Sequence, residues 1–142
     1  MSSMPSIKSR EIKIVQEIPI SKNLKFYQGL REGKVYATKC KDCGKIFFPP
    51  NVDCPECLST GLDWVELSSE AEIETFTHVV VRPTTFQQYK PYTVAIGRLK
   101  EDVKVLAWLT GFKLSEVKVG MKAKLIARVT SEGYATYEFV RP

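Results

Sequence analysis

The sequence predicts a mainly β protein of two modules, a small metal ribbon preceded by a helix and a closed barrel. Two Cys-x-x-Cys pairs separated by ten residues lie in the first half, and short alternating strands fill the second half. No stretch alternates a strand with a long helix, which excludes a doubly wound α/β domain. We therefore expect an arm over residues 1–19, the helix and ribbon over 20–61, and the barrel over 62–142.

The composition is that of an ordinary globular protein. Of the 142 residues, 44% are hydrophobic and 26% are charged. The apolar runs are much shorter than the ~20 residues that cross a bilayer, and the first residues mix charged with apolar side chains, unlike a signal peptide. We expect a cytoplasmic protein with reduced thiols and no membrane association.

The net charge of +5 is concentrated in the first half of the chain. Residues 1–61 carry ten basic and six acidic side chains, whereas residues 62–142 carry eleven and ten. A modest basic patch suits a partner that bears phosphate, although a few lysines are more often a solvated face.

Residues 20–33 have the pattern of a short helix that depends on tertiary contacts. Ser21 is a suitable N-cap, and Gly33 fits the position after the last turn. Phe26 and Tyr27 are interpreted either as packing against the ribbon or as the wall of a ligand groove, and residue type alone favours packing. The preceding arm has no clear period and at most a short strand over residues 12–18.

Four cysteines have the spacing of a tetrahedral thiolate site: Cys40, Cys43, Cys54 and Cys57. Two intervening residues let a tight turn direct both sulfurs of a pair at one point, and Gly44 suits the positive φ of such a turn. Two turns complete a shell with no open position, so we expect a structural Zn²⁺ ion. Iron competes for such sites, but Leu58 follows the second pair where an electron-transfer rubredoxin has glycine, which favours zinc. Disulfides would need an oxidising compartment, for which the sequence gives no sign.

The remaining pattern predicts strands bounded by turn residues. Those of the ribbon are expected at 34–39 and 45–48, and those of the second module at 62–67, 71–81, 92–100, 103–110, 121–129 and 135–139. Five or six short strands, with a helical turn over 114–117, suit a small closed barrel of the OB-fold type.

The sequence gives no positive sign of catalysis. His78 is the only histidine, the metal uses every cysteine, and no nucleophile, phosphate-loop or metalloprotease motif occurs. The polar, aromatic loop 82–91 is the other candidate site, because loops between strong strands often carry function. Its polar side chains can bind amide and phosphate groups while Phe86 and Tyr89 cover an apolar chain; the alternative is a packed surface loop.

These motifs together resemble a family of small archaeal and bacterial proteins, long catalogued as a domain of unknown function. In that family a rubredoxin-like zinc ribbon precedes an OB-fold. The matching residues are 26–33, 40–44, Pro49-Pro50, 54–57, Trp64, Phe76-Thr77, 91–96, 109–111 and 119–121. The resemblance covers the chain from about residue 20 to its C-terminus.

The resemblance implies an association with acyl-CoA metabolism. Family members accompany thiolases, including the archaeal acetoacetyl-CoA thiolase and HMG-CoA synthase pair, which the small protein bridges while it helps to hold the CoA pantetheine. The implied function is a non-catalytic scaffold whose partners are acyl-CoA and a thiolase-type enzyme. Basic side chains suit the phosphates of CoA and aromatic rings suit its adenine. The candidate CoA contacts are therefore Lys22, Lys25, Phe26, Tyr27, Arg31, Arg82 and Phe86.

Two other functions compete with this interpretation. Zinc ribbons and OB-folds both bind nucleic acids, but the near-neutral barrel disfavours that function because single-strand grooves concentrate positive charge. A stand-alone thioester hydrolase would need a nucleophile and base pair, which the sequence does not reveal.

Overall fold

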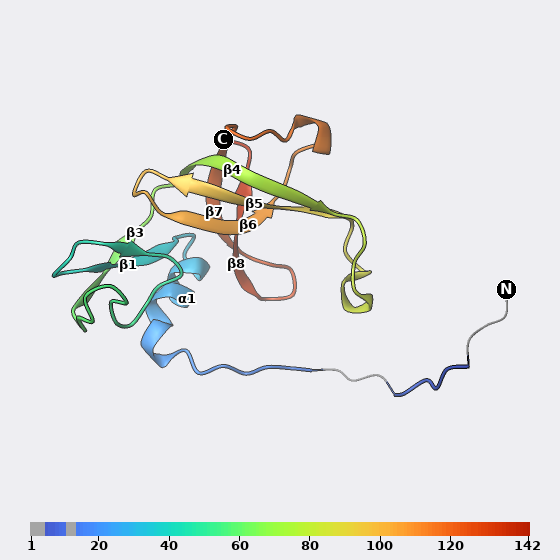
Figure 1. Cartoon of the computed structure of the whole chain (residues 1–142), viewed down its shortest axis with the longest axis horizontal. Helices are drawn as coiled ribbons and strands as arrows, with labels where there is room; N and C mark the ends of the chain where they lie inside the picture. Colours follow the sequence, from blue (N-terminus) through green and yellow to red (C-terminus); the bar gives the residue numbers. More distant parts are fainter. Residues whose placement is uncertain (1–4, 11–13) are drawn as a thin grey trace.

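The structure, a computed structural model, describes residues 5–10 and 14–142 and confirms the mainly β architecture (Figure 1). A 3₁₀ turn, η1 (Ser21–Asn23), leads into the helix α1 (Leu24–Arg31). The ribbon strands are β1 (Tyr36–Cys40), β2 (Ile46–Phe47) and β3 (Leu62–Glu66). The barrel strands are β4 (Glu70–Val79), β5 (Tyr92–Leu99), β6 (Lys104–Leu109), β7 (Lys122–Val129) and β8 (Ala135–Val140), with 3₁₀ turns η2 (Thr84–Phe86) and η3 (Leu114–Glu116) between them.

The arm runs as an extended, exposed segment through its described residues, 5–10 and 14–19. None of these residues forms a strand, and residues 12 and 13 of the expected short strand lie outside the described part. Ile14, Val15 and Ile18 are all exposed, so the large apolar side chains in this described part of the arm are not buried.

The helix α1 begins later than the sequence predicts. Ser21 lies in η1 and is not an N-cap; the backbone N–H of Asn23 donates to the carbonyl of Ile20 (2.9 Å), so a main-chain turn replaces the expected side-chain cap. The end agrees with the prediction, because Gly33 has a φ of +80° just beyond the last turn. Within the helix, Gly29 allows close packing: a Cβ there would lie 2.5 Å from the ring of Tyr36.

The ribbon is a three-stranded antiparallel sheet in the order β2-β1-β3. β3 pairs with β1 along its full length, from Tyr36 opposite Glu66 to Cys40 opposite Leu62. The strand expected at 62–67 therefore lies in the ribbon sheet and not in the barrel. Its alternating pattern indicates a strand, but such a pattern does not specify the neighbouring strand.

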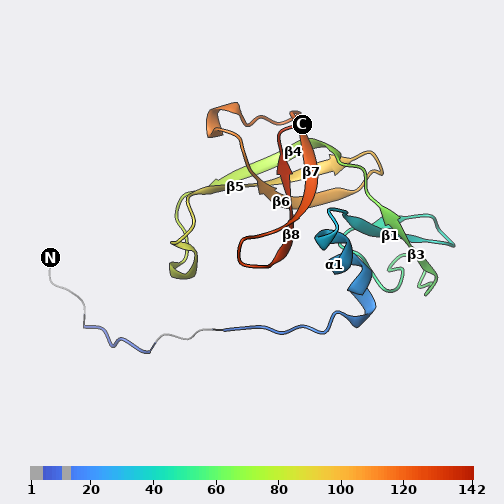
Figure 2. The same ribbon diagram turned by 180° about the vertical axis from the view of Figure 1, so that it is seen from behind.

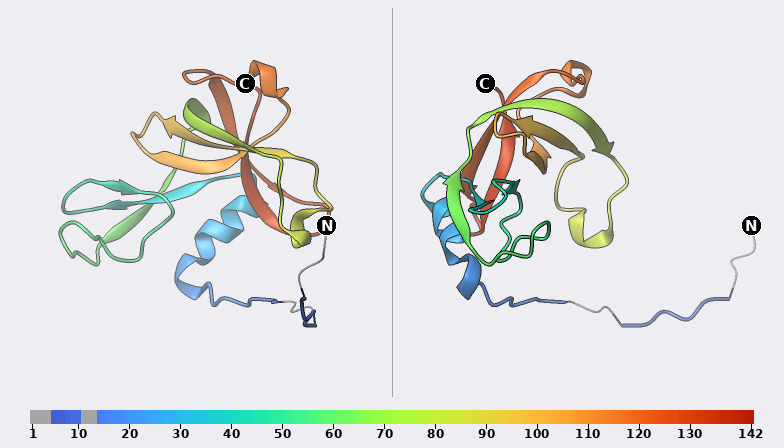
Figure 3. Two further views of the ribbon diagram at one scale, coloured as in Figure 1. Left: turned by 45° about the vertical axis from the view of Figure 1, so that its right-hand side comes forward. Right: turned by 60° about the vertical axis from the view of Figure 1, so that its left-hand side comes forward.

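The second module is a closed five-stranded barrel in the order β4-β5-β6-β8-β7, which confirms the expected OB-fold. β4 is long and curved; it pairs with β7 at its first residues and with β5 along most of its length (Figure 3). Phe139 lies fully buried at the centre, together with Ile73 and Val105. Gly97 makes room for it, because a Cβ there would lie 2.6 Å from the Phe139 ring.

The ribbon and the barrel pack against each other through α1, which lies beside β7 and β8 (Figure 2). The contact is aromatic: the ring centroid of Phe26 lies 6.0 Å from that of Phe48 and 6.2 Å from that of Tyr137. Burial raises the pKa of the Tyr137 hydroxyl, with a smaller contribution from Tyr27. This cluster is the apolar joint between the two modules.

The link between β3 and β4 is short, and its residues form hydrogen bonds to both the ribbon and the barrel. The N–H of Leu67 donates to the carbonyl of Val35 (2.9 Å), which ties the link to the ribbon. Ser68 donates from its N–H and hydroxyl to the two carboxylate oxygens of Glu101 (2.7 and 3.0 Å), which ties it to the β5–β6 turn.

Figures 1 and 2 place the loop 80–91 on the side of the barrel away from the ribbon. The β7–β8 turn lies between this loop and α1 in both views. None of the helices in the described residues has the length and apolar content that crossing a membrane requires.

Candidate metal centre and ligand-facing surfaces

Two similar tight turns hold the four cysteines. The N–H of Gly44 donates to the carbonyl of Cys40 (3.0 Å), and the N–H of Leu58 donates to the carbonyl of Cys54 (3.0 Å). Both residues that close the turns have positive φ, +73° at Gly44 and +62° at Leu58. Glycine adopts this conformation freely, whereas leucine does so at a cost of about 1–2 kcal/mol.

The four sulfurs lie within 4.8 Å of one another. The Sγ atoms of Cys40 and Cys57 are 3.6 Å apart, as are those of Cys43 and Cys54. A tetrahedral ion with bonds of ~2.3 Å requires sulfurs about 3.8 Å apart, which the 3.6 Å separation of these two pairs approaches. Cys40 and Cys54 are buried while Cys43 and Cys57 are exposed, so the centre lies at the surface of the ribbon.

The thiols ionise unequally because they are so close. The N–H of Cys43 points at the Cys40 sulfur (3.5 Å) and lowers the pKa of Cys40 to about 6. The N–H of Ser59 acts in the same direction on Cys57, but the neighbouring Cys54 sulfur and burial outweigh it and raise the pKa of Cys57 to about 12. Four thiolates at this spacing therefore need a cation among them.

Some of the η1 and α1 residues that the sequence analysis proposes as CoA contacts are buried, and others are exposed. Phe26 is 7% exposed and lies in the aromatic joint, so its ring offers no face to a ligand. Tyr27 is half-exposed beside it, and the ammonium of Lys25 lies 5.1 Å from the centroid of the Tyr36 ring. Lys22 and Arg31 are exposed at opposite ends of the η1–α1 segment. Nine residues of helix separate their backbone positions by roughly 13 Å, which disfavours the binding of one phosphate by both side chains.

The loop 80–91 folds around a ladder of aromatic rings. Phe86 lies 5.5 Å from Tyr89, and Tyr89 lies edge-on to Trp108 at 6.0 Å. Tyr92 stacks on Trp108 at 4.3 Å. The sequence analysis assigned no role to Tyr92 or Trp108, yet Trp108 occupies an outward position in the alternation of its strand, and an outward tryptophan is the signal that could have found it.

Arg82 lies in this loop without a charged partner. One guanidinium nitrogen, Nη1, donates to the backbone carbonyl of Tyr89. The Nε atom is buried and has no acceptor among the described residues. No carboxylate of the described chain forms an ion pair with Arg82.

The outer surface of β5 and β6 beside this loop is apolar, and together with Val79 of β4 we call it the apolar face; Thr75 and Thr77 of β4 border it. Its residues are Val79, Tyr92, Val94, Ile96, Leu106 and Trp108, which the strand register places in adjacent rows. Leu106 is 61% exposed, and Val80 and Val81 extend the patch. The next row is charged, with Arg98 and Lys104 both paired with Glu74 (2.5 and 2.9 Å).

His78 is placed as a structural residue. Its Nδ1 lies 2.9 Å from the hydroxyl of Thr93, which is buried, and His78 itself is half-buried.

Comparison with known proteins agrees with this architecture. A family model described as "ChsH2, rubredoxin-like zinc ribbon domain" matches residues 28–63, and one described as "ChsH2, C-terminal OB-fold domain" matches residues 64–128. A DUF35 domain-containing scaffold protein of Pyrococcus furiosus is 32% identical over 76% of this chain and 79% of its own. One from Methanocaldococcus jannaschii is 30% identical over 71% and 75%.

A solved structure titled as the Ltp2-ChsH2(DUF35) aldolase superposes with a TM-score of 0.76 at 20% identity, over 89% of this chain and 98% of that one. A DUF35 protein of unknown function from Sulfolobus solfataricus gives a TM-score of 0.61 at 24% identity, over 86% of each chain. The chain therefore belongs to the DUF35 family, whose members join a ChsH2-type zinc ribbon to an OB-fold.

Proposed function

We propose that this protein is a non-catalytic accessory protein that docks on a thiolase-type enzyme and contacts its acyl-CoA. The observation that carries the proposal is Arg82, an unpaired cation set in an aromatic loop beside the apolar face. The names of the relatives support it, since two are scaffold proteins and a structural neighbour is part of an aldolase complex.

Arg82 is the proposed polar contact for the ligand. A guanidinium has five donors, and a buried donor without an acceptor costs about 1–3 kcal/mol. An amide carbonyl or a phosphate from an acyl-CoA would bind the outer guanidinium donors of Arg82 that the carbonyl of Tyr89 does not occupy. Phe86, which is 37% exposed, then covers the apolar part of the chain.

The apolar face is the proposed contact for the enzyme. Contiguous exposed apolar side chains with aromatic residues at their centre are typical of protein interfaces. In the charged row that borders it, the carboxylates of Glu74 and Asp102 balance the two cations, Arg98 and Lys104, which disfavours a nucleic-acid backbone there.

The metal in this proposal is a structural Zn²⁺ held by Cys40, Cys43, Cys54 and Cys57. When bound it supplies the positive charge that keeps four thiolates together, and the closed shell leaves no position for a substrate. Lys22, Lys25, Tyr27 and Arg31 stay in the proposal as surface contacts for CoA or the enzyme, whereas Phe26 leaves it because its ring is buried.

Calorimetric titration of acetyl-CoA into the metal-loaded protein tests the ligand. We expect saturable binding that Arg82→Ala weakens about tenfold, the size of one charge-assisted hydrogen bond. Lys113→Ala is the matched control, because it removes a cation outside the loop, and should bind normally. A single-stranded oligonucleotide is titrated in parallel; salt-sensitive binding of it, with no acetyl-CoA signal, would contradict the proposal.

A pull-down with the tagged full chain tests the partner, with bound proteins identified by mass spectrometry. We expect a thiolase-type enzyme to be recovered and Leu106→Glu to abolish its recovery. Val119→Glu places the same charge at a residue of similar exposure outside the apolar face, 68% against 61%, and should leave recovery unchanged.

A further inference from the structure

We infer that Lys45 and Glu56 form a bridge across the exposed side of the metal centre, and that this bridge slows the loss of the ion. The Nζ atom of Lys45 lies 2.9 Å from a carboxylate oxygen of Glu56. Lys45 ends the first cysteine turn, residues 40–45, and Glu56 lies within the second, residues 54–59. The ion pair therefore joins the two turns that supply all four thiolates. The inference rests on the structural metal of the proposed function.

The backbone closes each cysteine turn on itself and does not join the two turns. In the first turn, the N–H of Cys40 donates to the carbonyl of Lys45 (2.9 Å). In the second turn, the N–H of Cys54 donates to the carbonyl of Ser59 (2.8 Å). Among the described residues, no backbone hydrogen bond runs from one turn to the other. Contact between the turns therefore depends on the sulfur cluster and on the side chains around it.

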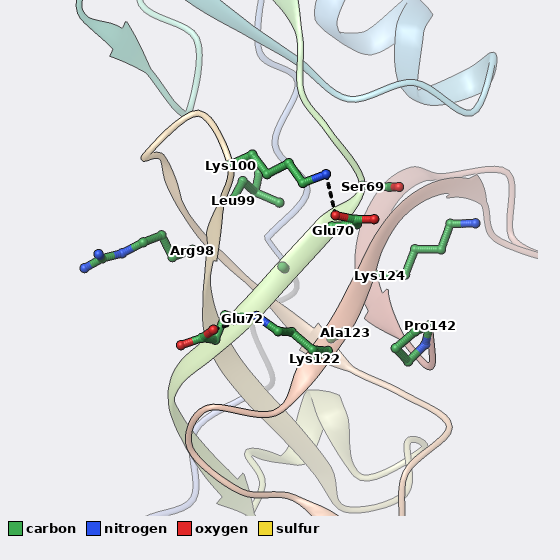
Figure 4. A pocket seen from close by; sticks show the side chains of 11 residues that line it. Ser69, Glu70, Glu72, Arg98, Leu99, Lys100, Lys122, Ala123, Lys124 and Pro142 are labelled. Atoms are coloured by element: carbon green, nitrogen blue, oxygen red, sulfur yellow. Dashed lines mark hydrogen bonds and ion pairs between the residues drawn. The ribbon is translucent and has the colours of Figure 1, made fainter.

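Some exposed ion pairs of the barrel only add to strands that the backbone already joins. Figure 4 shows one of them, in which Lys100, just after β5, reaches Glu70 at the start of β4. The two strands pair directly beside these residues, so the ladder holds them without the ion pair. An exposed ion pair in such a place contributes little to stability. The bridge differs because it links two segments that have no ladder between them.

The bridge lies on the side of the metal centre that faces solvent. Cys43 and Cys57 are the exposed candidate ligands. Lys45 comes two residues after Cys43, and Glu56 comes directly before Cys57. The side chains of both bridge residues are half-exposed. A chelator approaches the ion from this side, so a link here opposes the separation of the turns that lets the ion leave.

The positive end of the bridge also favours the metal-bound state. The pKa of Lys45 is raised above its ordinary value, first by Glu56 and then by the negative charge of Cys43 and Cys54. These two sulfurs belong to different turns, so the ammonium lies within electrostatic range of both. A shell of four thiolates around Zn²⁺ is a net anion, and a nearby cation stabilises it.

Glu56 distinguishes a bridge from a simple effect of charge. By charge alone, its carboxylate disfavours an anionic metal centre, so its removal would slow the loss of metal. As the acceptor of the bridge it has the opposite effect, because without it the ammonium of Lys45 is no longer held between the turns. The direction in which Glu56→Ala changes metal loss therefore tests the inference.

Release of Zn²⁺ from the loaded full chain into an excess of a chromogenic chelator at low salt measures the bridge. Lys45→Ala and Glu56→Ala should each speed the release about twofold to fivefold, the size expected for a half-exposed ion pair. The double variant should release metal no faster than the faster single variant, because either change already breaks the pair. Lys45→Arg keeps the cation and should restore slow release. Added salt should reduce the differences, since it screens exposed charges.

Lys41 and Asp63 supply the matched control pair. Their charged atoms are 3.3 Å apart at similar exposure, but this pair joins the first turn to β3. The N–H of Lys41 already donates to the carbonyl of Gly61 (2.9 Å), so the backbone duplicates the link. Lys41→Ala and Asp63→Ala should therefore leave the release rate unchanged. Equal acceleration by the control variants and the bridge variants would overturn the inference.

Failure of the bridge is distinct from failure of the metal assignment. A Glu56→Ala variant that holds Zn²⁺ as well as the unchanged protein, or better, would overturn the bridge while the structural metal stood. Elemental analysis of the unchanged protein tests the metal independently. A chain that retains no Zn²⁺ after loading would remove both the metal and the bridge.

Discussion

The ribbon and the barrel reach an ordered structure by different means. The barrel buries a continuous apolar core around Phe139, Ile73 and Val105, each of them inaccessible to solvent. The ribbon has few buried apolar side chains of its own, and two of its most buried residues, Cys40 and Cys54, are candidate metal ligands. A segment too small to bury a core takes its folding free energy from the ion. The comparison teaches that one chain can contain a metal-dependent part and a metal-independent part.

Replacing a ligand gives the largest expected effect. Cys40→Ser removes a thiolate, and structural zinc contributes about 10–16 kcal/mol in small domains, so the ribbon should lose both its metal and its order. The barrel should keep its fold, because none of its strands contributes a ligand. Elemental analysis and an amide NMR spectrum measure the two outcomes. A normal metal content in the variant would show that the four cysteines are not the site.

Removing the central ring of the barrel is the reciprocal test. Phe139→Ala should lower the free energy of unfolding by about 3–5 kcal/mol, through lost burial and the cavity left behind. Denaturant titration measures the loss. Tyr134→Ala is the matched control, because that aromatic ring is 67% exposed in the β7–β8 turn, and should change stability little. Equal losses of unfolding free energy in the two variants would contradict the assignment of Phe139 to the barrel core.

Acidification should weaken the ribbon selectively. In the metal-free site at pH 7, Cys43 and Cys57 are protonated because their pKa values are raised. Cys40, with a pKa of about 6, is largely ionised at that pH. Metal binding at pH 7 should therefore release about two protons or more. Affinity falls as pH falls, by about 2.7 kcal/mol per unit for two protons. Calorimetry in buffers of different ionisation enthalpy counts the protons; release of none would contradict this ionisation pattern.

The smallest expected effect concerns the strained turn. Leu58→Gly should stabilise the metal-loaded ribbon by up to about 1 kcal/mol, because glycine adopts the observed φ of +62° without steric conflict. Chelator competition at fixed pH measures this gain, because the Leu58→Gly variant should need a higher chelator concentration than the unchanged protein to lose half of its metal. Gly44→Leu places the same strain in the other turn and should have the opposite sign. A loss in both variants would indicate that the Leu58 side chain itself stabilises the turn.

Local patterns predicted much of this molecule. The spacing of Cys40, Cys43, Cys54 and Cys57 indicates a metal site because both pairs are short-range features that need no knowledge of the fold. The barrel strands follow equally from alternation along the chain. The outward position of Trp108 was also visible in that alternation, although its stacking partner Tyr92 was not.

Features that depend on distant pairing could not be predicted. β3 has the same alternating pattern whether it joins the ribbon or the barrel, and only its pairing with β1 assigns it. Phe26 sits on a helix whose exposed and buried faces are decided by Phe48 and Tyr137.

The bonded link at Leu67 and Ser68 has a mechanical consequence. Its hydrogen bonds to Val35 and Glu101 oppose rotation between the modules, and the aromatic joint at Phe26 opposes it on the other side. A change in the angle between the ribbon and the barrel would have to break these contacts. An assembly that binds both modules would therefore meet them in the arrangement that the link and the joint favour.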